Sequence, residues 1–150
     1  MKVKTAKEML DAVKNIWTDM DIGVFAAAVA EYRPKNIETE KIKKSSDILT
    51  IDMVENPDIL KWAGEQKSDH QCLVGFALET NDLLKNSSKK LEEKNLNIIV
   101  MNSLKDKGAG FGGDTNKISI LDNRNNTESF ELKSKNEVAK DILRYVKKYI

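Results

Sequence analysis

The chain has 150 residues, enough for one domain with a buried core. Its 25 Lys and Arg residues nearly balance its 24 Asp and Glu residues. The resulting net charge of +1 excludes an overall field that would hold nucleic acid or an anionic membrane, so we expect neither as a partner. The single cysteine, Cys72, excludes an intramolecular disulfide, and we expect a cytoplasmic protein. No segment has the roughly 20 apolar residues that a membrane-spanning helix needs.

The N-terminal third predicts a helix followed by a buried strand. Thr5 and Glu8 form a capping box, in which each side chain accepts a hydrogen bond from an otherwise unpaired amide. Apolar residues then recur at helical spacing as far as Trp17. The segment Asp21–Ala28 is short, mostly apolar and bounded by polar residues, which favours a strand.

The middle of the chain alternates in the same way. Leu49–Val54 alternates like an edge strand, and Asn56-Pro57 predicts a helix start, with Asn as the cap and Pro in the first turn. Cys72–Leu78 and Leu96–Met101 are apolar enough for buried strands. A helix running to about Glu93 separates them, and its apolar face is predicted to be Leu83, Leu84 and Leu91.

The C-terminal part predicts a hairpin and a last helix. Lys117–Leu121 and Glu128–Leu132 flank the turn-rich Asp122–Asn126. Ser134 and Glu137 form a second capping box. The inward-facing residues of this helix are predicted to be Val138, Ile142, Leu143, Val146 and Ile150. The alternation of helices and buried strands predicts an α/β, Rossmann-like fold with a mostly parallel sheet flanked by helices and an antiparallel hairpin near the C-terminus.

The end of the first predicted strand has the residue types of a ligand site. The strand stops in small alanines, and Glu31, Arg33 and Lys41 follow. Ligands of open α/β sheets bind at the carboxyl ends of strands, and small side chains let a ligand approach the backbone. The segment therefore predicts a site for a phosphorylated molecule. A solvated charged loop is the alternative, and this segment alone does not decide between them.

Two further features could serve such a site. Lys90 and Lys94 are four residues apart on a predicted helix and share a face, so with Lys41 they could bind a triphosphate. Lys85 and Lys89 have the same spacing, so a solvated helix face is the alternative. Gly108–Gly113 matches the G-x-G-x-x-G pattern of dinucleotide sites, but a predicted strand follows it instead of a helix, which argues against a nicotinamide or flavin site. The sequence assigns no metal ligands.

Six segments in order resemble the phosphopantothenate–cysteine ligase family, whose bacterial members are usually the C-terminal domain of a bifunctional coenzyme A biosynthesis flavoprotein. The segments are Ala-Ala-Val-Ala-Glu-Tyr-Arg, Glu-Lys-Ile-Lys-Lys, Asn-Pro-Asp-Ile, Val-Gly-Phe-Ala-Leu-Glu-Thr, Lys-Asn-Leu-Asn and Phe-Gly-Gly-Asp-Thr-Asn. The resemblance implies a two-step ligation. The carboxylate of 4'-phosphopantothenate attacks the α-phosphate of CTP, which is used with Mg²⁺, and pyrophosphate leaves. The amine of cysteine then attacks the acyl-cytidylate to give phosphopantothenoylcysteine and CMP.

The resemblance also implies roles for residues. Ala27, Ala28 and Glu31 correspond to positions that bind phosphopantothenate or the acyl-nucleotide, and Lys41 corresponds to a catalytic lysine on a mobile loop. Glu31 stands where the family has aspartate, which lengthens the side chain by one methylene. The implied nucleotide-binding residues are Phe25, Ala26, Ala27, Glu31, Lys41, Asn56, Pro57, Asp58, Ile59, Phe76, Lys90 and Lys94.

The resemblance does not cover a whole ligase domain. Residues 1–150 are expected to be a single partial domain, the C-terminal two-thirds, without the Arg- and Asn-containing N-terminal loop of the family and without the decarboxylase domain that carries FMN. We therefore expect an incomplete active site in these residues alone. The family also implies a homodimer, with the Lys41 loop and Leu49–Val54 near the interface. The alternative function is a non-catalytic module that binds a nucleotide or a partner protein.

Overall fold

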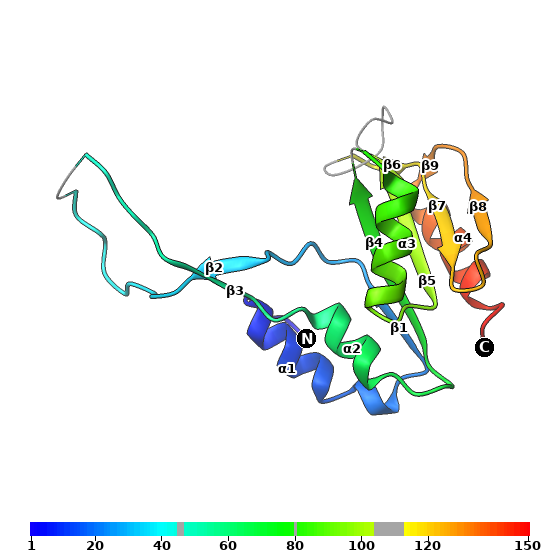
Figure 1. Cartoon of the computed structure of the whole chain (residues 1–150), viewed down its shortest axis with the longest axis horizontal. Coiled ribbons are helices and arrows are strands. Elements are labelled where there is room, and N and C mark those ends of the chain that lie inside the picture. The colour runs from blue at the N-terminus through cyan, green and yellow to red at the C-terminus, as the bar shows by residue number, and fades with distance from the viewer. Residues whose placement is uncertain (45–46, 80, 104–112) are drawn as a thin grey trace.

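The computed structural model describes residues 1–44, 47–79, 81–103 and 113–150. A central sheet lies between helices on both faces (Figure 1). A long arm, made of the segments 32–44 and 47–55, projects away from this body and has paired strands only at its base. The N-terminal helix lies near the base of the arm.

The central sheet is parallel on one side and antiparallel on the other. Its order is β1-β4-β5-β7-β8; β4 pairs in parallel with β1 and β5, whereas β7 is antiparallel to both β5 and β8. The strands are β1 (Ile22–Phe25), β4 (Cys72–Glu79), β5 (Ile98–Ser103), β7 (Ser119–Asp122) and β8 (Thr127–Ser129). This topology confirms the predicted α/β, Rossmann-like fold with its antiparallel hairpin.

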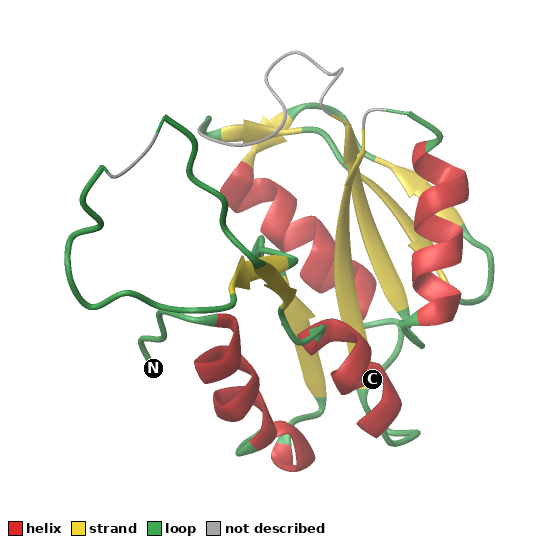
Figure 2. Ribbon diagram, turned by 60° about the vertical axis from the view of Figure 1, so that its left-hand side comes forward, coloured by secondary structure: helices red, strands yellow, loops and turns green. Residues whose placement is uncertain are grey.

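Helices cover both faces of the sheet, as Figures 1 and 2 show together. The helices are α1 (Ala6–Lys14), the 3₁₀ turn η1 (Trp17–Asp19), α2 (Ile59–Gln66), α3 (Leu83–Glu93) and α4 (Lys135–Val146). On one face, Ile142 and Val146 of α4 pack against Val74 and Val100 of the sheet. On the other face, α2, α3 and the buried Trp17 pack against Leu73 and Ile99. Cys72 is buried in the first of these cores.

Two small sheets complete the fold. β2 (Tyr32–Pro34) pairs antiparallel with β3 (Met53–Glu55) and forms the base of the arm. β6 (Thr115–Asn116) pairs antiparallel with β9 (Lys133–Ser134), directly before α4.

Local hydrogen-bonding signals decide the helix starts. Both capping boxes are confirmed: the Thr5 and Ser134 side chains accept from the amides of Glu8 and Glu137, whose carboxylates accept in return. The predicted start of α2 at Asn56-Pro57 is wrong. The Asn56 side chain donates to the Ala30 carbonyl instead, and the helix is capped two residues later by Asp58.

Several predicted elements differ in extent. The first helix stops at Lys14 and only a 3₁₀ turn reaches Trp17. β1 covers Ile22–Phe25 alone, because its pairing with β4 ends at Phe25–Gly75 and the chain then leaves the sheet for the arm. Likewise, β5 begins at Ile98, where its pairing with β4 begins. Of the predicted strand Leu49–Val54, only Met53 and Val54 pair, with Pro34 and Arg33.

Three leucine or isoleucine positions that were predicted to face inward are exposed: Leu84, Leu143 and Ile150. On α3, Leu91 is buried and Leu83 packs against the core, as predicted, while Ser87 is buried in addition. Periodicity overstates the width of an apolar face where a helix covers the sheet with a narrow stripe.

Candidate functional site

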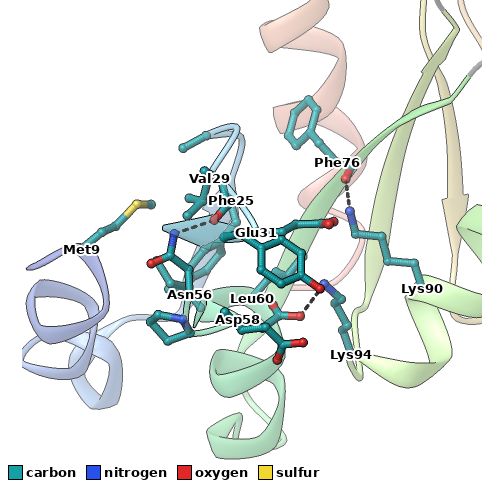
Figure 3. Close-up of a pocket in the computed structure, with 16 residues that line it drawn as sticks. Met9, Phe25, Val29, Glu31, Asn56, Asp58, Leu60, Phe76, Lys90 and Lys94 are labelled. Carbon is teal, nitrogen blue, oxygen red and sulfur yellow. Dashed lines mark hydrogen bonds and ion pairs between the residues drawn. The ribbon is translucent and has the colours of Figure 1, made fainter. Parts of the chain in front are cut away.

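A cavity of about 370 Å³ lies where the chain leaves β1, beside α2 and α3 (Figure 3). It gathers residues from five separate stretches of the chain. Its lining is Met9, Phe25, Ala27, Val29, Ala30, Glu31, Tyr32, Glu55, Asn56, Pro57, Asp58, Ile59, Leu60, Phe76, Lys90 and Lys94. The carboxyl ends of parallel strands form one edge of the sheet, which explains why the segment after β1 and residues of β4 meet there.

One wall is the segment that follows β1. Asn56 holds this wall: its amide donates to the carbonyl of Glu31 at 2.7 Å, and its side-chain nitrogen donates to the carbonyl of Ala30 at 2.9 Å. Arg33 donates to the Asn56 side-chain oxygen at 3.3 Å. Asn56 therefore ties the two sides of the arm base together, and its side chain positions the wall.

The apolar part of the cavity includes Phe25, Ile59, Leu60 and Phe76. The Phe25 ring meets the buried ring of Trp17 edge to face, with centroids 6.0 Å apart. Aromatic and aliphatic surface of this kind suits the flat, weakly polar part of a ligand.

Two lysines of α3 form the basic part. The Lys90 ammonium donates to the carbonyl oxygen of Phe76 at 2.8 Å, and the Lys94 ammonium lies 2.7 Å from a carboxylate oxygen of Asp58. Both contacts are drawn in Figure 3. Burial lowers the pKa of Lys90 below its usual 10.5, and the charge of Lys94 adds to this, while Asp58, Glu79 and Glu31 oppose it. The lysines are thus fixed by protein partners at one side of the cavity.

Asp58 lines the cavity and also stabilises the start of a helix. It caps α2 by accepting from the amide of Lys61 at 3.0 Å. Partial burial would raise the pKa of Asp58, but the hydrogen bonds from Lys94 and Lys61 and the charges of Lys94 and Lys90 leave it below the usual 3.8. The carboxylates among the lining residues are Asp58, Glu31 and Glu55, so the lining carries three acidic groups against two lysines.

The structure brings most of the predicted site residues together. Ten of them line the cavity: Phe25, Ala27, Glu31, Asn56, Pro57, Asp58, Ile59, Phe76, Lys90 and Lys94. Ala26 and Ala28 are not among the lining residues. The sequence reasoning missed Met9, Val29, Ala30, Tyr32, Glu55 and Leu60. Glu55 and Tyr32 could have been found only from the pairing of β2 with β3, which places them opposite each other.

Lys41 lies elsewhere. It lines a separate hollow of about 570 Å³ on the arm, together with Glu38, Glu40, Leu49 and Asp52. Lys41 itself is exposed, and the arm runs well away from the body (Figure 1). Apolar side chains of the arm are also exposed: Ile37, Ile42, Ile48, Leu49, Ile51 and Met53. The arm therefore presents an apolar surface beside Lys41.

The glycine-rich segment 108–113 lies outside the described residues except for Gly113. Within residues 1–44, 47–79, 81–103 and 113–150, no group of three or more His, Cys, Asp or Glu could by itself hold a metal ion. In the same ranges, no helix is long and apolar enough to cross a bilayer.

Comparison with known proteins decides the family. Residues 1–150 match the DFP model, described as the DNA/pantothenate metabolism flavoprotein C-terminal domain. The chain belongs to this family. The ligase resemblance inferred from the six segments is confirmed at this level.

The relatives are longer proteins. A cysteine/cysteine sulfinic acid decarboxylase from an unknown prokaryotic organism is 48% identical over 144 residues, covering 96% of this chain and 40% of that protein. The coenzyme A biosynthesis bifunctional protein CoaBC of Bacillus subtilis strain 168 is 40% identical over 144 residues, covering 96% of this chain and 35% of the relative. The chain thus spans about two-fifths of these relatives or less.

Solved structures share the fold. The crystal structure of the C-terminal domain of a CoaBC protein superposes with a TM-score of 0.78 at 33% identity and covers 97% of this chain and 63% of that one. A Cab2 variant, in complex with phosphopantothenate-cysteine, has a TM-score of 0.71 at 18% identity, covers 99% of this chain and 53% of that one, and shows the same fold.

Proposed function

We propose that the chain is the nucleotide- and acyl-phosphate-binding part of a phosphopantothenate–cysteine ligase of coenzyme A biosynthesis, acting in the cytoplasm. The overall reaction joins 4'-phosphopantothenate and cysteine to phosphopantothenoylcysteine at the expense of CTP. One observation supports this most strongly. Phe25, Ala27, Asp58, Phe76 and Lys94 come from distant parts of the sequence, yet they line a single cavity with an apolar side and a basic side.

The cavity suits a nucleoside phosphate. In our proposal, Lys90 and Lys94 bind phosphate oxygens as compact positive charges. Phe25 and Phe76 contact the base or the ribose, and the small side chain of Ala27 lets the acyl-phosphate approach the backbone. This is chemistry by positioning and by neutralisation of phosphate charge, and it needs no acid–base pair.

Magnesium enters this proposal with the triphosphate. Mg²⁺ usually keeps several waters and binds one or two protein carboxylates in addition to substrate phosphates. Glu31, Glu55 and Asp58 are the carboxylates available in the cavity. One or two of them would be enough for that role, since the substrate phosphates and water supply the other ligands. FMN belongs, in this proposal, to a decarboxylase domain outside these 150 residues.

We propose Lys41 as the catalytic lysine that stabilises charge developing on the α-phosphate. Since Lys41 lies on the arm and not in the cavity, this role requires the arm to carry it there. We also propose a homodimer in which the exposed apolar side chains of the arm, such as Ile42, Leu49 and Ile51, contact a second copy.

A non-catalytic module that binds a nucleotide or a partner protein is the second candidate. It is favoured by one observation: Lys41 lies outside the cavity. This candidate predicts nucleotide binding without turnover.

Two measurements test the proposal. Calorimetry with CTP and Mg²⁺ should show binding to the chain, and the absence of binding would refute both candidates as nucleotide proteins. A ligase assay with CTP, 4'-phosphopantothenate and cysteine then separates them. Release of pyrophosphate and formation of phosphopantothenoylcysteine, by the chain alone or after addition of the remaining ligase-domain segment of a CoaBC relative, supports the ligase. Binding without turnover in both conditions supports the module.

A further inference from the structure

The two lysines of the cavity differ in the charge of their partners. Lys90 donates to the Phe76 carbonyl, a neutral acceptor, and the charges of Asp58, Glu79 and Glu31 also act on it. Lys94 is paired at 2.7 Å with the carboxylate of Asp58. The Lys94 side chain is only 23% exposed, so the pair is partly shielded from water and from salt.

Asp58 is held in this position by the fold. Its other carboxylate oxygen, Oδ1, accepts from the amide of Lys61 as the cap of α2, while Oδ2 faces Lys94. The carboxylate therefore cannot swing away freely when another anion approaches, because movement breaks the cap. A phosphate oxygen that binds Lys94 must then share the ammonium with a fixed negative charge or displace it.

We propose that Asp58 is an internal competitor for the phosphate that Lys94 binds, and that it determines how tightly the cavity retains phosphate products. This inference rests on the proposed function, which assigns the two lysines to a nucleoside phosphate. Its consequence is specific: the inorganic pyrophosphate released in the first step is held weakly at Lys94, because Asp58 recovers its partner when the phosphate leaves.

The test compares Asp58→Asn with the wild-type chain. Asparagine caps helices about as well as aspartate, so the substitution removes the charge and keeps the start of α2. The matched control is Asp82→Asn, which removes one negative charge at the first residue before α3, at the opposite end of this 11-residue helix from Lys94. Calorimetry at low ionic strength measures the dissociation constants for inorganic pyrophosphate and for CTP with each variant.

We expect Asp58→Asn to bind pyrophosphate and CTP about threefold to tenfold more tightly than the wild type, since a partly exposed carboxylate no longer opposes the phosphate. Asp82→Asn should bind both ligands as the wild type does. The melting temperature of Asp58→Asn should fall by no more than about 4 °C, since it loses one partly exposed ion pair and keeps the helix cap. If this variant does not fold, Asp58→Ser, which also preserves a capping side chain, is measured with the same expectation.

The outcomes separate this inference from the proposed function. Equal affinity in the wild type and Asp58→Asn overturns the inference and leaves nucleotide binding intact. Weaker binding by Asp58→Asn also overturns it, and shows that Asp58 positions Lys94 for the ligand. Failure of every variant, the wild type included, to bind CTP overturns the proposed function and the inference with it.

Discussion

Gly64 is the position where the structure makes its sharpest prediction for a single atom. A Cβ added at Gly64 of α2 would lie 1.9 Å from the carbonyl oxygen of Lys94, and ordinary contact begins near 3.4 Å. The Asn95 side chain also donates to the Gly64 carbonyl at 2.9 Å, so the two backbones are held together. Gly64→Ala must therefore push the end of α3 away from α2 by roughly 1.5 Å.

The magnitude follows from three contributions. Overpacking against backbone costs about 1–3 kcal/mol, and we take the upper half of this range because a carbonyl oxygen cannot rotate away. Loss of the hydrogen bond from Asn95 costs about 1 kcal/mol, and the better helix propensity of alanine returns about the same amount. The free energy of unfolding should therefore fall by about 2–3 kcal/mol.

Urea unfolding of Gly64→Ala, followed by circular dichroism, measures this loss. The control is Glu65→Ala, the next and exposed position of α2, which should change the free energy of unfolding by less than about 0.5 kcal/mol. Because the shift displaces Lys94, Gly64→Ala should also weaken CTP binding. A Gly64→Ala variant as stable as the wild type would refute the close approach of the two helices.

Three more predictions follow from individual contacts. Lys94→Ala should weaken CTP binding about tenfold or more, because a charge-assisted hydrogen bond to phosphate is lost. Lys89→Ala, which removes an exposed ion pair with Glu93, should leave CTP binding unchanged. Equal effects of the two substitutions in calorimetry would show that Lys94 does not contact the nucleotide. Lys41→Ala should leave the stability unchanged but abolish ligation wherever the intact enzyme turns over, and unchanged turnover contradicts its catalytic role. Burial would raise the pKa of Asp122, but hydrogen bonds, chiefly from Asn126, hold it at about 2 instead of 3.8. Above pH 3.8 this lowered pKa adds about 2 kcal/mol to the free energy of unfolding, and the contribution is lost as the pH falls through 2. In urea unfolding, Asp122→Asn should therefore lose less stability than the wild type when the pH is lowered from above 3.8 to 2. The same pH dependence in the variant and the wild type would contradict the lowered pKa.

The sequence predicts features that depend on neighbours along the chain. The capping boxes at Thr5 and Ser134 involve residues three apart, so the residue types at these positions are enough to predict both helix starts. The fold class also follows, because apolar runs such as Cys72–Leu78 are long enough to be buried on both faces.

Features set by distant contacts could not be read in this way. Asn56 has the residue type of a helix cap, but the Ala30 carbonyl, 26 residues away, takes its side chain and leaves the cap to Asp58. β1 ends at Phe25, where its pairing with β4 stops, and no local sequence pattern encodes this end.

The candidate site shows the same division. Spacing alone could not choose Lys90 and Lys94 over Lys85 and Lys89; the family resemblance made that choice, and the structure places the chosen pair in the cavity. The ion pair of Lys94 with Asp58 joins residues 36 positions apart and had no signal in the sequence.

We propose that the segment after β1, the start of α2, β4 and α3 form one nucleotide site. The most direct test is a titration of the ¹⁵N-labelled chain with CTP and Mg²⁺, followed by amide chemical shifts. We expect the largest shifts at Ala27, Glu31, Asp58, Phe76 and Lys94, with little change in β8 and α4. Shifts concentrated in β8 or α4, with those five amides unchanged, would contradict a nucleotide site in this cavity.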